Sequence, residues 1–163
     1  LSRGAQRVVM VVKDRHAAAI LRRNIAKVDL PGASVAQEDA VRMTSLAPLR
    51  GTFDVVFMDP PYVMSDVQVS QILASLSSQG WLNLEAVTVV ERSKESDLAW
   101  PDTWELLSKR EYGGTVLATG VWYVHDRAYG GLSRLVRPGD PRPPGCLRSR
   151  LESLRRSNGC GAD

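Results

Sequence analysis

The chain has 163 residues, of which 44% are hydrophobic, and this suits one globular domain with a sizeable core. No stretch approaches the ~18–20 continuous apolar residues that a membrane span requires, so we expect no membrane partner. The formal net charge is +3, but residues 127–163 hold eight of the 21 basic residues and three of the 18 acidic ones. The rest of the chain carries 13 basic and 15 acidic side chains, so overall basicity is weak support for nucleic-acid binding by the body.

The cysteine pattern argues against a protein stabilised by disulfides and against a metal site built from cysteines. Cys146 and Cys160 both lie near the C-terminus, with no metal-ligand spacing and no disulfide framework. The first twelve residues lack the small-residue cleavage pattern of a signal peptide. We therefore expect a cytoplasmic protein that holds no metal.

From residue 7 onward the sequence alternates between strand and helix patterns. "RVVMVV" (7–12) is a continuous apolar run, typical of a strand that is covered on both faces. Residues 14–28 carry apolar side chains at helical spacing after Asp14, a residue type that caps helices. A short strand at 33–37 and a brief helix at 40–47 follow.

The second half of this pattern predicts three more strands and one helix. "FDVVFM" (53–58) is an apolar run that we expect to form a buried strand, and the helix expected at 66–77 has one apolar face. A strand at 84–92 precedes two strands, 103–112 and 115–124, which "GG" joins as a hairpin. The apolar face of the helix consists of Val69, Ile72, Leu73 and Leu76. This order predicts an α/β fold with an open, doubly wound sheet and a closing antiparallel hairpin.

The C-terminal tail differs in composition from the rest of the chain. Residues 127–163 contain four of the nine prolines, six of the 13 glycines and eight arginines, with little periodicity. This composition predicts disorder, although residues 147–156 could form a short helix. We therefore divide the chain into a domain at 1–126 and a tail at 127–163. The tail either binds RNA phosphates through its arginines or is read-through of GC-rich sequence beyond the natural end of the domain.

The segment "DPPY", residues 59–62, carries most of the functional information. Ligands of open α/β sheets bind beyond the carboxyl ends of the strands, and Asp59 follows such an end. A carboxylate that accepts N–H bonds from an amino group on a base makes its nitrogen more nucleophilic. Pro60 and Pro61 fix φ and donate no N–H, so carbonyls of the loop can serve as further acceptors. The ring of Tyr62 can stack on an unstacked base. The alternative is that the two prolines merely end the strand.

With its flanking segments, this motif resembles the amino methyltransferases that use S-adenosylmethionine. The segments "LSRGA", "KDRHAAAILRRNIA", "FDVVFMDPPY", "VVERS" and "KREYGGTVL" are similar to the bacterial RsmD family. The resemblance covers residues 1 to about 120. It implies a Rossmann-like class I fold that transfers a methyl group to N2 of a guanine in 16S rRNA.

The resemblance also implies roles for individual residues. Asp59 and the Pro60 carbonyl would hold the guanine amino group, and Tyr62 would stack on the base. Arg92 lies at a strand end that faces the crevice, where it either contacts substrate or forms a surface ion pair. The substrate partner is 16S rRNA or the small ribosomal subunit, and we expect a monomer.

Four residues fall where the family binds its cofactor. Asp39 would contact the adenine of S-adenosylmethionine and Ala40 would follow through its backbone, although Asp39 may equally cap the helix that begins there. Val12 and Lys13 occupy the end of the first strand. There the family places a carboxylate that accepts both ribose hydroxyls, which neither side chain can do.

The sequence also lacks the glycine-rich loop and first strand with which the family begins its domain, so residues 1–126 form a partial methyltransferase domain. That strand lies between strands 7–12 and 53–58, which therefore either close on each other or keep unpaired edges. Three other interpretations remain: an adenine-N6 methyltransferase, a non-catalytic nucleic-acid-binding remnant, and a truncated product without function.

Overall fold

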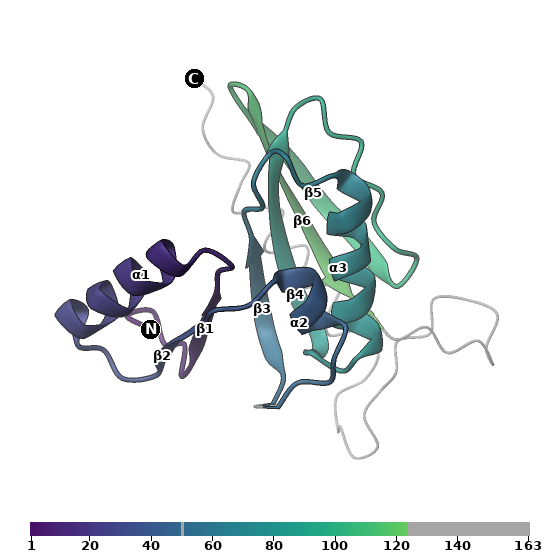
Figure 1. The fold of residues 1–163 in the computed structure, drawn as a ribbon. Coiled ribbons are helices and arrows are strands. Elements are labelled where there is room, and N and C mark those ends of the chain that lie inside the picture. Colours follow the sequence, from purple (N-terminus) through teal and green to yellow (C-terminus); the bar gives the residue numbers. More distant parts are fainter. Residues whose placement is uncertain (50, 124–163) are drawn as a thin grey trace, which may run out of the picture. The chain divides into compact units, whose positions relative to one another are not determined.

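A computed structural model describes residues 1–49 and 51–123 (Figure 1). Within these, Leu1–Trp122 belongs to one compact unit. The predicted tail at 127–163, with its helix at 147–156, lies outside the described residues. The division of the chain at residue 126 therefore stays a prediction.

The N-terminal segment is a β-α-β unit with two parallel strands. It consists of β1 (Val8–Val11), α1 (Arg15–Val28) and β2 (Ala33–Ala36), close to the predicted bounds. Helix α1 begins after Asp14, whose carboxylate accepts a backbone N–H of the first turn at 2.7 Å. It ends at Asp29, which adopts a left-handed φ of 51°. The predicted cap and helix are confirmed.

A four-stranded sheet and two helices make up the rest of the described chain. In chain order the elements are α2 (Ala40–Thr44), β3 (Phe53–Met58), α3 (Asp66–Ser78), β4 (Leu82–Ser93), β5 (Trp104–Tyr112) and β6 (Thr115–Trp122). The spatial order of the strands is β3-β4-β6-β5, with β3 parallel to β4 and β6 antiparallel to both of its neighbours. The predicted hairpin is confirmed, and Gly113 in its turn has a φ of 61°, which glycine adopts without strain.

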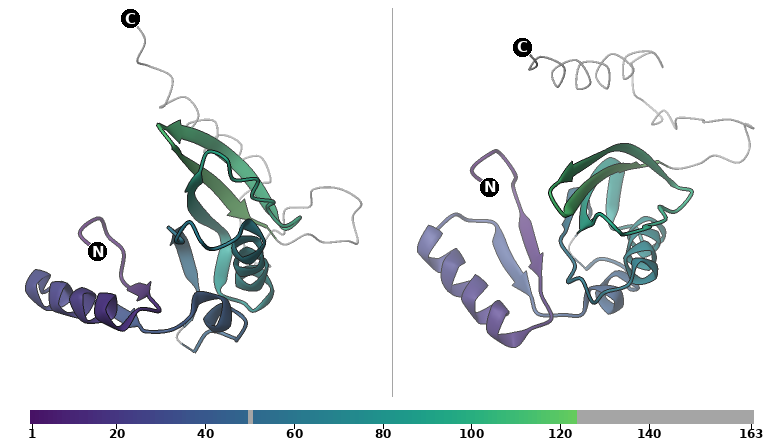
Figure 2. Two further views of the ribbon diagram at one scale, coloured as in Figure 1. Left: turned by 45° about the horizontal axis from the view of Figure 1, so that its top comes forward. Right: turned by 90° about the horizontal axis from the view of Figure 1, so that it is seen from above.

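Helix α2 is three residues shorter than its predicted range of 40–47. The Ser45 hydroxyl donates to the Arg42 carbonyl at 2.7 Å and so competes with continued helical bonding. Pro48 also disfavours helical geometry at the residue before it. Helix α2 packs beside α3 (Figure 2).

The core forms where α3 lies along one face of the four-stranded sheet (Figure 2). The predicted apolar face of α3 is entirely buried, and Leu73 and Val69 are among the largest fully buried side chains. They pack with Val90 of β4, Trp81 and Trp104. Each fully buried aliphatic side chain contributes about 1.5–3 kcal/mol, so this contact holds the sheet and helix together.

The sheet that the sequence predicts as one is divided in two. Strands β1 and β2 form one sheet, and β3 forms the edge of the other, with no pairing between β1 and β3 in the described residues. The two strands therefore do not close on each other. On β3, Val55 is 49% exposed and Phe57 is 80% exposed, although the sequence predicts a buried strand. Val55 and Phe57 alternate with Val56 and Met58, which pack against the core, so burial of the two exposed side chains requires a layer on the other face of the sheet.

We expect the substitution Gly120→Ala to destabilise the domain. The ring of Trp100 occupies the space that a Cβ at Gly120 requires. This ring also packs edge-on against Trp104, with centroids 5.7 Å apart, so it cannot shift freely. Overpacking of this kind costs about 1–3 kcal/mol, measurable by urea unfolding followed by circular dichroism.

Gly114→Ala is the matched control. No atom lies within 4 Å of the position that its Cβ would take. We expect a change in unfolding free energy within about 0.5 kcal/mol. Equal losses for the two variants would contradict the assignment of the Gly120 effect to Trp100.

Candidate functional site

The predicted acceptor loop, residues 59–64, leaves the carboxyl end of β3 and leads into α3. Its Tyr62 is 71% exposed and Asp59 is also exposed. The Met64 N–H donates to the Pro61 carbonyl at 2.8 Å, so this carbonyl is occupied. Within residues 1–49 and 51–123, neither the Asp59 carboxylate nor the Pro60 carbonyl has a hydrogen-bond partner. The loop therefore offers two adjacent unpaired acceptors beside an exposed ring.

The end of the acceptor loop is fixed by the start of α3. Ser65 is the N-cap, and its side chain accepts from the Gln68 N–H at 3.3 Å. The Gln68 side chain in turn accepts from the Ser65 N–H at 3.1 Å, which completes a capping box. The helix therefore begins at a defined residue immediately after the loop.

Arg92, at the carboxyl end of β4, is directed at this junction and is only 9% exposed. Its Nε donates to Asp66 Oδ1 at 2.9 Å, and its Nη2 donates to the Met64 carbonyl at 2.7 Å. Its Nη1 is buried and has no partner in the part of the chain that is described. The ion pair is thus largely buried and not at the surface, while contact with substrate stays a prediction.

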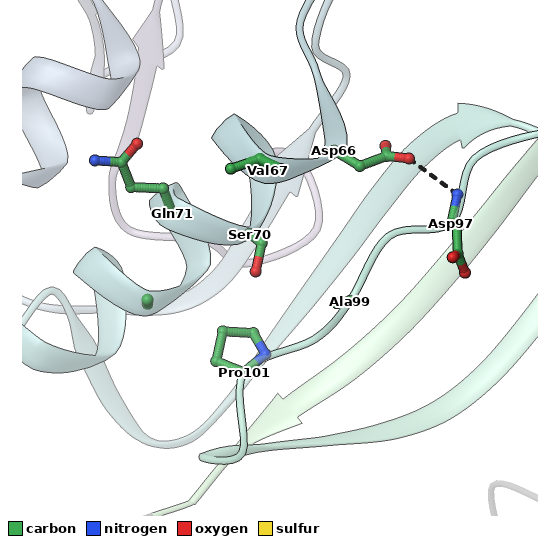
Figure 3. Close-up of a pocket in the computed structure, with 8 residues that line it drawn as sticks. Asp66, Val67, Ser70, Gln71, Asp97, Ala99 and Pro101 are labelled. Carbon is green, nitrogen blue, oxygen red and sulfur yellow. Dashed lines mark hydrogen bonds between the residues drawn. The ribbon is translucent and has the colours of Figure 1, made fainter.

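The Asp66 carboxylate also holds the turn that follows β4. It accepts from the Ser96 hydroxyl at 2.7 Å. It also accepts from the Asp97 N–H at 2.9 Å, the bond drawn in Figure 3. Burial alone would raise the pKa of Asp66. The hydrogen bonds from Ser96, Arg92 and Asp97 outweigh burial and hold the pKa below its ordinary value of 3.8.

The predicted cofactor residues gather at the carboxyl ends of β1 and β2. Lys13 Nζ and Asp39 Oδ2 form an ion pair at 2.9 Å, and Ala40 is the first residue of α2. Asp39 Oδ1 caps α2 by accepting from two backbone N–H groups at 3.0 and 3.2 Å. The hydrogen bond from Lys13, followed by the bond from the Arg42 N–H, lowers the pKa of Asp39. The capping role is therefore present, and the adenine contact stays a prediction.

Val12 lies at the end of β1, where the sequence predicts it. Its N–H donates to the Ala36 carbonyl at 3.0 Å, and its carbonyl accepts from the Glu38 N–H at 3.1 Å. Its backbone is therefore engaged with the chain after β2, and its side chain offers no acceptor. No hydrogen bond or ion pair in the described ranges links this group of residues to the acceptor loop.

Sequence reasoning missed Asp66 and the backbone of Met64. The signature Ser65-x-x-Gln68 could have located the start of α3, because this spacing is that of a capping box. The pairing of Asp66 with Arg92 joins residues 26 positions apart and leaves no local signal.

A shallow groove lies between α3 and the chain that follows β4 (Figure 3). It is lined by Asp66, Val67, Ser70, Gln71, Ala74, Asp97, Ala99 and Pro101. Its surface is mostly apolar, and it contains no residue predicted from the sequence as part of the site.

Two searches of the described residues bear on other kinds of site. No helix there is long and apolar enough to span a membrane. The same residues contain no cluster of three or more side chains that could together hold a metal ion.

Solved structures define the class of this fold. A candidate methylase from Haemophilus influenzae is 26% identical, with a TM-score of 0.67 and 76% of each chain covered. A candidate methyltransferase from Escherichia coli is 25% identical, also with a TM-score of 0.67, over 75% of this chain and 66% of that one. The fold is that of the Rossmann-like class I methyltransferases.

The family follows from the sequence comparison. The profile of the family described as conserved hypothetical protein 95 matches residues 1–121, and the chain belongs to this family, the RsmD family. The ribosomal RNA small subunit methyltransferase D of Haemophilus influenzae is 30% identical over 118 residues, 69% of this chain. The match spans 58% of the length of that relative.

We expect Asp66→Asn to lower stability at neutral pH and to have little effect in acid. Because folding lowers the pKa of Asp66 below 3.8, the stabilisation by its ionised form is present above that value. It is lost as the pH falls through the folded pKa. Urea unfolding at pH 7 should show a loss of about 1–3 kcal/mol.

The control for this comparison is Asp59→Asn, which makes the same change at a carboxylate without a partner in the described chain. We expect it to unfold like the unaltered protein at pH 7 and at pH 3. An Asp66→Asn loss that persisted undiminished at pH 3 would show that the carboxylate charge is not its source.

Proposed function

We propose that this chain is the catalytic part of an S-adenosylmethionine-dependent methyltransferase that modifies N2 of a guanine in 16S rRNA. The observation that carries this proposal is the acceptor loop, in which the Asp59 carboxylate and the Pro60 carbonyl have no partner among the described residues and lie beside the exposed Tyr62. Membership of the RsmD family supports it, as does the similarity to the ribosomal RNA small subunit methyltransferase D of Haemophilus influenzae. We place the reaction in the cytoplasm, on free rRNA or the small subunit, with the protein acting as a monomer.

The side chains at the ends of β1 and β2 fit the adenine end of this cofactor. Asp39 has about four lone-pair sites, so it can accept from an adenine amino group in addition to its bonds with Lys13 and α2. The ribose end fits poorly, because Val12 provides only hydrocarbon where hydroxyl groups need an acceptor. When bound, the cofactor supplies a methyl group on a positively charged sulfur.

The chain's own residues would act on the guanine. The Tyr62 ring would stack on the base and hold its plane. The Asp59 carboxylate and the Pro60 carbonyl would accept the two N–H bonds of the amino group and so free the nitrogen lone pair. As the N–C bond forms and the bond from the methyl group to the cofactor's sulfur breaks, these acceptors would stabilise the positive charge on nitrogen without having to reorient. The nitrogen would then lose one N–H proton to the Asp59 carboxylate that accepts its hydrogen bond.

A methyl-transfer assay tests this role. With tritiated S-adenosylmethionine and unmethylated small subunits, we expect Asp59→Asn to lower kcat about 100-fold, because an amide lacks the negative charge. The Michaelis constant for RNA should change little. Asp54→Asn is the matched control. Asp54 lies near the start of β3, the strand that Asp59 follows, and this variant should transfer methyl groups at the normal rate.

Digestion of the labelled RNA to nucleosides separates the interpretations. Detection of N2-methylguanosine would support the proposal. Detection of N6-methyladenosine would instead show that the target base is adenine. Absence of label, together with RNA binding that falls steeply with salt, would favour a non-catalytic nucleic-acid-binding protein.

Val12→Glu tests the cofactor assignment in a separate way. A carboxylate at the end of β1 should accept the ribose hydroxyls and tighten binding of S-adenosylmethionine about 10–100-fold in calorimetric titration. Leu49→Glu adds the same charge at a side chain that is 98% exposed and should leave the affinity unchanged. Unchanged affinity in Val12→Glu would argue that ribose is not bound at β1.

A further inference from the structure

We propose that Arg92 and Asp66 are positioning residues that hold the acceptor loop in the geometry needed for methyl transfer. This inference rests on the proposed function, because it assigns a purpose to the loop's shape. It concerns neither contact with substrate nor contact with cofactor. The pair acts through the backbone of Met64.

The pair connects two segments that are distant in the sequence, the acceptor loop with the start of α3 and the end of β4. Arg92 comes from the end of β4, and its Nη2 donates to the Met64 carbonyl at 2.7 Å. The N–H of the same Met64 donates to the Pro61 carbonyl at 2.8 Å. Both backbone polar groups of Met64 are therefore held, one by the sheet and one by the DPPY motif. A shift of Arg92 would therefore be transmitted to Pro61 through two successive hydrogen bonds, from Arg92 to Met64 and from Met64 to Pro61.

Asp66 holds the guanidinium in place for this task. Its carboxylate accepts from Arg92 Nε at 2.9 Å, and it also accepts from the Ser96 hydroxyl and the Asp97 N–H. The pair is mostly buried, with side-chain exposures of 10% and 26%, so salt and solvent screen it less than a surface pair. A planar guanidinium can bond the carboxylate and the carbonyl together, whereas the point charge of lysine cannot reproduce this geometry.

The burial of Arg92 favours positioning over direct substrate contact. Two of its nitrogens, Nε and Nη2, already have partners within the protein. The third, Nη1, is buried. Substrate could reach it only if the chain around it moved. The side chain therefore acts on the reaction through the loop.

Amide hydrogen exchange tests the proposal independently of activity. In Arg92→Met we expect the Met64 N–H to exchange at least about tenfold faster, since its neighbouring carbonyl loses its bond to the sheet. The core amide of Val90 should keep its protection. Arg92→Lys keeps the charge, and its Met64 N–H should exchange at a rate between those of the unaltered protein and Arg92→Met. Arg110→Met, on the exposed outer strand β5, is the matched control and should leave both amides unchanged.

Kinetics then separates positioning from a purely structural role. We expect Arg92→Met to lower kcat about tenfold or more, while the affinity for S-adenosylmethionine and the Michaelis constant for RNA stay within about twofold. Arg92→Lys should recover part of kcat. A structural role alone would lower the active fraction and the protection of Met64 and Val90 together.

The outcomes distinguish this inference from the proposed function. Fast exchange at Met64 in a chain that transfers no methyl group would overturn the proposed function and, with it, the purpose assigned to the pair. Normal exchange at Met64 in Arg92→Met, with methyl transfer intact, would overturn the positioning role alone. Loss of RNA binding with unchanged kcat would instead assign Arg92 to substrate contact.

Discussion

The packing of α3 against β4 is the contact on which the rest of the described structure depends. Val69 and Leu73 have no exposed surface, and Val90 opposite them is equally buried. This contact fixes the position of the helix relative to the sheet, and therefore the position of the helix start relative to the ends of β3 and β4. The six residues of the acceptor loop span a distance that the core has already set. Their geometry is thus a consequence of apolar burial as well as of their own sequence.

Each candidate site contains an ion pair, and the two pairs differ in burial and therefore in how strongly they hold the local structure. The Lys13–Asp39 pair has side-chain exposures of 80% and 37%, so water and salt weaken it and the cap of α2 remains the main local role of Asp39. The Arg92–Asp66 pair is shielded, and the loss of one partner would leave a charge in a mostly buried place. The difference in burial decides which pair can transmit a structural constraint.

The sequence predicts local features of this protein well and long-range features poorly. The apolar face of α3 and the turn at Gly113 depend on residues within a few positions, and both are confirmed. The ion pair of Arg92 with Asp66 depends on two segments meeting in space, and no spacing encodes it. Phe57 is predicted as buried because its strand is apolar, but its burial requires a distant segment that covers its face of the sheet. The substrate and cofactor contacts stay predictions.

The two prolines of the acceptor loop and the hydrogen bond from the Met64 N–H together determine which acceptors of the loop stay available. In the described chain, the Pro61 carbonyl is used by Met64, while the Pro60 carbonyl and the Asp59 carboxylate remain unpaired. Neither proline has an N–H that could satisfy a nearby acceptor, and both have a fixed φ. The loop thus keeps two acceptors open by removing the local donors that would otherwise fill them. A flexible loop could collapse onto its own N–H groups, and catalysis by fixed acceptors requires that this does not happen.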